Sequence, residues 1–305
     1  MDKSTIELKL SYLLKHLLLS SLIVCNVFLG MSQMILNQNG EAFTSEPFFN
    51  NEVINKNRIH RITGEYSFKK NKDLIRAVPG SFTYEFNNNG YLSSSIDIRW
   101  NGKSLDTTVK YYSYNQKGSI ISLKKSENQG ITLQEFKRDS LNRIISQANY
   151  RVSLNGKGEV LNKTEMNTET MEYTNKRKTT FNSYKLPYLI SYDEYNEDGY
   201  KISSIDKLKM GGTMYKKLYI YNKKGLLVNI KTFYDRHENP VEELKFQYDD
   251  FGNLIERHEI KQEVFIRDLQ IIFDNKTGLL HSIIDRNPIN NFMSIIRFTN
   301  YEFYL

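Results

Sequence analysis

The chain has 305 residues, a formal net charge of +7 and one cysteine, Cys25. A single cysteine excludes an intramolecular disulfide and a metal site built from several thiolates. The basic residues are spread along the chain, and the densest cluster, "NKRKTT" at residues 175–180, follows acidic residues. We therefore expect a solvated surface of mixed sign and no nucleic-acid partner, which would need a continuous basic face.

The first predicted element is an export signal at residues 1–32. A stretch containing lysines precedes an apolar run at residues 17–31, which is shorter than the roughly 20 residues of a membrane-spanning helix. Small residues near its end predict cleavage between Ser32 and Gln33. An uncleaved anchor and a lipoprotein modified at Cys25 stay open as alternatives. We expect an exported product (periplasmic, cell-surface or secreted) that meets the membrane only through this signal during export.

Residues 33–80 contain no repeated motif. The stretch "EVINKNRIHRI" at residues 52–62 predicts an opening strand. We expect residues 33–80 to cap a repeat domain that occupies residues 81–305.

One short motif recurs through the repeat domain. It consists of an aromatic residue, Asn or Asp, two variable residues, Gly, one variable residue and an aliphatic residue, as in "YNKKGLL" and "YDDFGNL". Three further copies diverge from this pattern, and one of them places Asn142 at the Gly position. The predicted turn residues are Asn87, Gly90, Asn115, Gly118, Asn142, Asn196, Gly199, Asn222, Gly225, Asp249, Gly252, Asp274 and Gly278.

Each position of the motif has a physical reason. A type I turn favours Asn or Asp at its first position and Gly at its fourth, where a positive φ is needed. Such a turn joins two antiparallel strands and sets their register. We expect Tyr221 to lie opposite Leu227, so that the aromatic and aliphatic residues form a cross-strand pair.

The spacing of the motif predicts the architecture. Successive copies are separated by 24 to 28 residues, apart from the interval between Asn142 and Gly199. About 26 residues accommodate two strands and two turns, and a period of this size indicates a repeat array. The segment between residues 156 and 187 is irregular. The predicted fold is all-β, an antiparallel meander of repeated hairpins that forms a curled or extended sheet.

The motif resembles the YD repeat of the RHS/YD-repeat family, most closely in "YDDFGNLIER" and "RDSLNRII". The resemblance covers roughly residues 84–284. It implies an exported or surface protein built from β-hairpins. Large family members wrap a shell around a toxin domain, whereas this chain is too short to enclose one, so the resemblance implies a short member without a toxin.

The sequence shows no catalytic or metal-binding motif. The histidines after the predicted signal are His60, His237, His258 and His281, and none belongs to a paired metal motif such as H-E-x-x-H. No nucleophile elbow or phosphate-binding glycine loop is present. We therefore expect no enzyme activity, no cofactor and no metal, and ordinary surface positions for the histidines.

Aromatic residues are abundant, with 21 Tyr, 17 Phe and one Trp. Strands favour aromatics, and the repeat itself requires one, so most of these rings are expected to be structural. The alternative is a stacking platform for sugars or peptides, for which Trp100, Tyr111, Tyr112 and Tyr114 are the candidates.

These observations predict an exported, non-catalytic interaction or scaffold protein of the cell envelope, or a secreted one, with an unknown protein or glycan partner. A carbohydrate- or peptide-binding surface module is the alternative. An enzyme and an outer-membrane β-barrel rank below both. The aromatic C-terminus "FTNYEFYL" favours a barrel, but adjacent charges at Lys216 and Lys217 oppose a continuous lipid-facing band.

Overall fold

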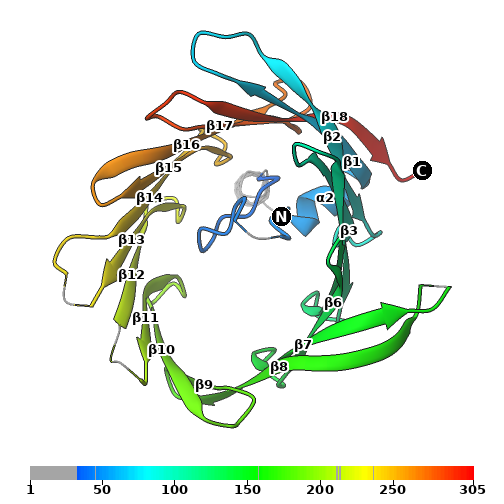
Figure 1. Cartoon of the computed structure of the whole chain (residues 1–305). Coiled ribbons are helices and arrows are strands. Elements are labelled where there is room, and N and C mark those ends of the chain that lie inside the picture. The colour runs from blue at the N-terminus through cyan, green and yellow to red at the C-terminus, as the bar shows by residue number, and fades with distance from the viewer. Residues whose placement is uncertain (1–32, 45, 157, 211, 213, 236) are drawn as a thin grey trace, which may run out of the picture.

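The computed structural model describes residues 33–305 except residues 45, 157, 211, 213 and 236. Within this part of the chain, eighteen antiparallel strands form one closed sheet around a lumen (Figure 1). The predicted signal and its cleavage site before Gln33 lie outside the described residues.

The strands follow one another as a meander, each paired with its neighbours in sequence except where the barrel closes. The elements are α2 (Asn51–Lys56), β1 (Ile59–Lys69), β2 (Arg76–Phe86), β3 (Leu92–Trp100), β4 (Leu105–Tyr114), β5 (Ile120–Glu127), β6 (Gly130–Arg138), β7 (Ile144–Leu154), β8 (Val160–Thr174), β9 (Arg177–Phe181), β10 (Pro187–Tyr195), β11 (Lys201–Leu208), β12 (Met214–Tyr221), β13 (Leu227–Tyr234), β14 (Glu242–Tyr248), β15 (Leu254–Lys261), β16 (Val264–Phe273), β17 (Leu280–Arg286) and β18 (Met293–Phe303).

Closure corrects the expectation of a curled or extended sheet. Strand β1 pairs with β2 on one side and with β18 on the other, so that Ile62 lies between Tyr84 and Tyr301. The twist that adjacent strands accumulate brings the last strand round to the first, and pairing satisfies the backbone groups of both edges. The domain boundary expected between residues 80 and 81 falls within β2, which is a full member of the barrel wall.

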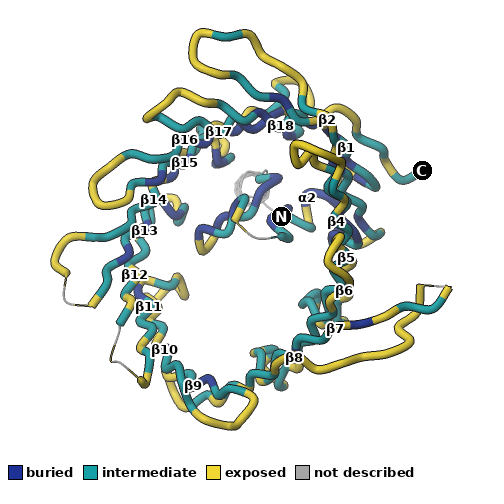
Figure 2. The backbone as a smooth tube through the Cα atoms, in the orientation of Figure 1, coloured by how far each residue is buried: buried dark blue, intermediate teal, exposed yellow. Residues whose placement is uncertain are grey.

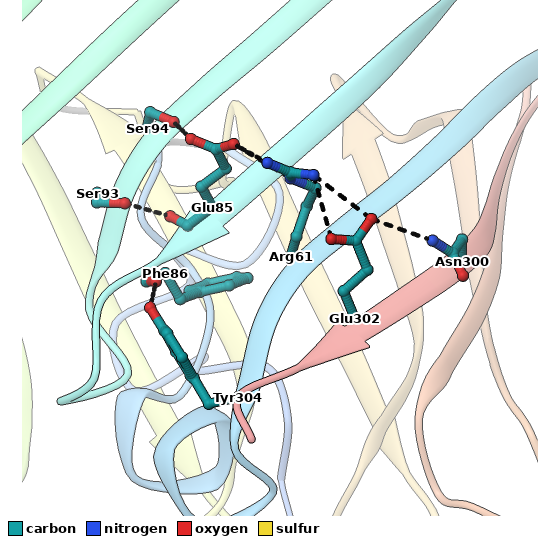
Figure 3. Close-up of polar contacts among 8 residues, drawn as sticks. All are labelled: Arg61, Glu85, Phe86, Ser93, Ser94, Asn300, Glu302 and Tyr304. Atoms are coloured by element: carbon teal, nitrogen blue, oxygen red, sulfur yellow. Dashed lines mark hydrogen bonds and ion pairs between the residues drawn. The ribbon is translucent and has the colours of Figure 1, made fainter.

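Side chains reinforce the closing seam of β18, β1 and β2 on the outer surface (Figure 3). The Arg61 guanidinium lies 2.9 Å from a Glu85 carboxylate oxygen and 3.1 Å from one of Glu302. The hydroxyl of Ser94 donates to Glu85 at 2.7 Å, and this bond, helped by Arg61 and opposed by partial burial, lowers the pKa of Glu85. The Tyr304 hydroxyl donates to the Phe86 carbonyl and ties the C-terminus to β2.

The repeated turn has the same geometry in copy after copy. At Asn222 the backbone N–H donates to the Leu226 carbonyl at 2.9 Å, and Gly225 has a φ of 75°. Tyr221 pairs with Leu227 across the β12–β13 hairpin. Asn142 takes a φ of 66° at the position that Gly holds elsewhere. Since copies lie two strands apart, these turns share one end of the barrel, which we call the repeat rim.

The tyrosine of the motif also links one hairpin to the one before it. Its hydroxyl donates to the backbone carbonyl at the aliphatic position of the preceding copy, and Arg138 makes the same link in a divergent copy. The observed bonds run from Tyr114 to Leu92 (2.8 Å), Arg138 to Ile120 (3.2 Å), Tyr221 to Lys201 (2.9 Å) and Tyr248 to Leu227 (2.8 Å). Tyr173, at the end of β8 and outside the motif copies, makes the same kind of bond to Ile144 (2.9 Å). We call this bond the hairpin staple.

Residues 33–44 and 46–56 lie inside the barrel and contribute to its core (Figures 1 and 2). Phe49 packs edge-on against Phe86 with ring centroids 5.2 Å apart, and Ile54 of α2 is fully buried. Asn50 caps the start of α2 by accepting from the Glu52 backbone N–H. The N-terminal segment therefore fills part of the lumen, and we call it the lumenal segment.

Candidate functional site

The lumen has two unlike halves. Strands β13–β18 and β1–β4 carry the buried apolar side chains that pack against the lumenal segment, and we call this the filled half. Strands β5–β12 form the open half, where none of the described residues belongs to the buried part of that core cluster. In Figure 1 the backbone of the lumenal segment lies nearer to the strands of the filled half than to β8 and β9. An 18-stranded barrel is wide enough for an interior space.

Register identifies which side chains of the open half face the lumen. Lys110 and Tyr112 of β4 point inward, because both contact Glu46 of the lumenal segment, at 3.0 and 2.5 Å. Following the paired residues from β4 to β10 places Gln147 and Ser191 on the same inner face. This face is polar, as the hydrogen-bonded row of Gln134, Asn149 and Asn167 illustrates.

A cavity of about 660 Å³ lies against this inner face near the repeat rim. Strands β7–β10 and the turn between β8 and β9 contribute its lining. The charged lining residues are Arg143, Lys176, Arg177, Lys178 and Asp193. Asp193 is neutralised by Lys201, whose ammonium lies 2.8 Å from it. Arg143 is likewise paired, with Asp139 at 2.7 Å. Lys176, Arg177 and Lys178 therefore give the cavity its net positive charge.

Other groups in the cavity complete a site for a polar ligand. Ser191 is only 5% exposed, and its hydroxyl has no hydrogen-bond partner among the described residues. The Arg143 guanidinium lies 4.4 Å from the centre of the Tyr173 ring, and burial raises the pKa of that phenol. Together these groups offer cationic donors, a free hydroxyl and a ring face.

The structure separates the aromatic residues proposed as a stacking platform. Trp100 and Tyr111 are 46% and 49% exposed and face outward on β3 and β4. Tyr112 is 7% exposed and bonded to Glu46 inside the barrel. Tyr114 makes a hairpin staple and stacks on Tyr91 at 4.9 Å. The four side chains are divided between two faces of the wall and do not form one surface.

The sequence showed the basic residues of the cavity as a cluster but did not show that they lie beside the lumen. The cluster at residues 175–180 lies at the β8–β9 turn beside the lumen. Ser191 and Asp193 of β10 carry no motif, and their placement depends on the pairing of Ser191 with Lys178 across β9 and β10. The one indication in the sequence is that Ser191 and Asp193 are two positions apart within the strand at 187–195, which puts both side chains on the same face.

The outer wall is mixed in character. Ile96, Ile98 and Val109 face outward on β3 and β4, whereas ion pairs occupy other outward positions, such as Lys163 with Glu135 at 2.7 Å. Among the described residues, no helix has the length and apolar character needed to cross a membrane.

Comparisons with known proteins give distant likenesses. A scan against protein families finds no match, and neither does a search of curated proteins. A porin-like protein from Bacteroides uniformis is 11% identical, with 80% of this chain and 98% of that chain covered and a TM-score of 0.39. A porin-like protein from Bacteroides vulgatus is 8% identical, with 79% and 97% covered and a TM-score of 0.29.

The Photorhabdus luminescens Tc holotoxin pore is 13% identical, with a TM-score of 0.31; the match covers 72% of this chain but only 12% of that chain. At these identities and scores the likenesses do not place the chain in a family or assign it a function. The resemblance to the RHS/YD-repeat family therefore rests on the motif.

The closed barrel overturns the functional expectation drawn from the sequence. That expectation ranked an interaction scaffold first, a surface module with exposed aromatics second and an outer-membrane barrel below both. A closed antiparallel barrel with an even number of strands is instead the architecture typical of outer-membrane proteins. The ranking was wrong because it treated the hairpin array as an open surface, whereas closure creates an interior.

Proposed function

We propose that the protein is a cell-envelope β-barrel that binds a small anionic solute in the open half of its lumen. The observation that carries the proposal is the basic cavity, in which Lys176, Arg177 and Lys178 remain in excess because Arg143 is paired with Asp139 and Asp193 with Lys201. Field lines from like charges converge in a concave site with low-dielectric walls, which raises the local concentration of anions.

The lining also suggests the chemistry of the solute. Lys176 and Lys178 form no ion pair with any described residue, so their ammonium groups are available to a phosphate or carboxylate. Met171 and the rings of Tyr173 and Tyr195 add apolar surface beside them. A cavity of about 660 Å³ is within the usual range for small-molecule sites. We therefore favour a phosphorylated solute with a ring or apolar body.

Calorimetric titration at low ionic strength tests the proposal, with inorganic phosphate and adenosine monophosphate as probes. The informative variant is Lys178→Met, which removes an inward charge and keeps an unbranched side chain. Lys207→Met is the matched control, because Lys207 lies on an outward position of β11. Loss of one charge-assisted hydrogen bond is expected to weaken binding about tenfold.

Binding of adenosine monophosphate that is weakened by Lys178→Met and unchanged by Lys207→Met would support the lumenal site. Equal weakening by both variants would show that the solute senses only the net charge of the barrel. If the wild-type chain bound neither inorganic phosphate nor adenosine monophosphate, the proposal would be wrong.

A second candidate function is that of an outer-membrane barrel, which closure of the sheet favours. Porins of 16 to 18 strands enclose aqueous channels, and this lumen has open space. Outward ion pairs such as Lys163 with Glu135 count against it, because lipid would have to accommodate them. Retention of the full-length chain in membranes after an alkaline carbonate wash would support this candidate, and complete release would exclude it.

Kinship with the RHS/YD-repeat family and export by an N-terminal signal are also proposals. The common turn geometry and the hairpin staple support the first, because they give a structural reason for both the Tyr and the Gly of the motif. The absence of enzyme activity stays a prediction. Mass measurement of the exported product, which should begin at Gln33, tests the second.

A further inference from the structure

A cluster of possible metal ligands lies on the outer wall of the filled half, away from the lumen. His258 of β15 lies opposite Asp268 of β16, and Glu256 is on the same face of β15 two residues earlier. Arg257, between them, points inward and donates to the Ala42 carbonyl at 3.1 Å. Strand alternation therefore turns all three side chains of the cluster outward.

The three side chains converge on a common point. His258 Nε2 is 3.0 Å from a Glu256 carboxylate oxygen and 3.4 Å from Asp268 Oδ1. One potential ligand atom from each residue lies within 4.8 Å of the others. The His258 ring packs edge-on against Phe265, with centroids 4.9 Å apart, which holds the imidazole in its orientation.

Asp268 supplies an independent sign that a ligand is accommodated here. The residue is 2% exposed although its side chain lies on the outer face of the wall. Arg286 holds Asp268 Oδ2 at 2.7 Å, whereas Oδ1 is buried and accepts no hydrogen bond among the described residues. A buried carboxylate oxygen without a hydrogen bond is costly, and coordination of a cation would satisfy it.

We propose that Glu256, His258 and Asp268 form a binding site for a divalent transition metal of the Zn²⁺ class. One imidazole nitrogen and two carboxylate oxygens are a donor set that Zn²⁺ accepts, whereas Ca²⁺ and Mg²⁺ prefer oxygen alone. Two carboxylates against the one guanidinium of Arg286 leave a negative charge that attracts a cation. A metal here would bridge β15 and β16 and leave its remaining coordination positions to water.

The cluster departs from the expectation that His258 is an ordinary surface residue. In "ERHE", Glu256 and His258 are two residues apart and so lie on the same face of a strand. Asp268 lies on the next strand, and only the β15–β16 register brings it opposite His258.

Titration of ZnCl₂ into the metal-stripped full-length chain, followed by calorimetry and by the shift in melting temperature, tests the site. His258→Ala and Glu256→Gln should each weaken binding at least tenfold. His281→Ala is the matched control, since His281 is exposed on β17 and lies outside the cluster; its ring hydrogen-bonds to Ser282. A parallel titration with MgCl₂ tests whether the site binds divalent cations through their charge alone.

Equal affinity in the wild-type chain and His258→Ala would overturn the assignment, as would the absence of zinc binding. If Mg²⁺ bound as tightly as Zn²⁺, the cluster would be an acidic surface that attracts divalent cations in general, and the assignment to a transition metal would be wrong.

Discussion

The filled and open halves of the barrel use the same hairpin turn but line the lumen with different residues. In the filled half Phe82, Phe86 and Leu254 belong to the buried core that includes the lumenal segment, and they are nearly inaccessible to solvent. In the open half the inner row is made of residues such as Gln134, Asn149 and Asn167, which bond to one another. The difference lies in the alternate strand positions that face inward.

This contrast separates two kinds of information in the sequence. The turn motif fixes where strands reverse and how they pair, and it is equally present in both halves. The inward positions determine whether the wall packs against protein or faces solvent. Stability should therefore depend mainly on the filled half, and ligand binding on the open half.

Removing a large side chain from the filled half is expected to have the largest effect. Phe86 is 1% exposed and packs on Phe49, so Phe86→Ala should lower the free energy of unfolding by about 3–5 kcal/mol through lost burial and a cavity. Phe136→Ala is the matched change in the open half, where the ring is only half-buried. Its cost should be well below that of Phe86→Ala. Urea denaturation of the two variants would show whether the halves differ, and equal losses would contradict the division.

The hairpins were predictable from the sequence, but closure was not. Asn222 and Gly225 specify a local turn through groups only three residues apart, and that turn sets the pairing of Tyr221 with Leu227. The seam instead pairs Ile62 with Tyr301, far apart in the chain, and no local motif encodes that contact. The lumenal cavity was hidden for the same reason. An inward and an outward lysine look alike until closure defines an inside.

A second, smaller effect should come from two repeat glycines, Gly90 in the filled half and Gly199 in the open half, because their surroundings differ. A Cβ at Gly90 would lie 2.0 Å from the Asn51 carbonyl oxygen of α2, whereas a Cβ at Gly199 would meet nothing within 4 Å. Both residues have positive φ, of 79° and 83°, which Asn tolerates better than other side chains.

Gly90→Asn should therefore cost about 1–3 kcal/mol through overpacking against the lumenal segment. Gly199→Asn should stay within about 0.5 kcal/mol of the wild type, as at other open surface positions. Thermal or urea unfolding of both variants measures the difference. Similar losses would mean that backbone strain, shared by the two turns, outweighs the contact with α2.

The smallest effect is expected from the hairpin staple, and it should be the same in both halves. Tyr114 and Tyr173 donate their hydroxyls to the carbonyls of Leu92 and Ile144 at 2.8 and 2.9 Å. Phe at either position keeps the ring and removes one hydrogen bond, worth about 0.5–1.5 kcal/mol. Burial raises the pKa of both phenols, so each hydroxyl stays protonated and able to donate well above neutral pH. The loss should therefore be constant between about pH 6 and pH 9, a range below the ordinary tyrosine pKa. Urea unfolding at several pH values provides the measurement. A loss confined to Tyr114→Phe would show that the staple contributes only where the lumenal segment supports the wall, and the common role assigned to the repeat would then be wrong.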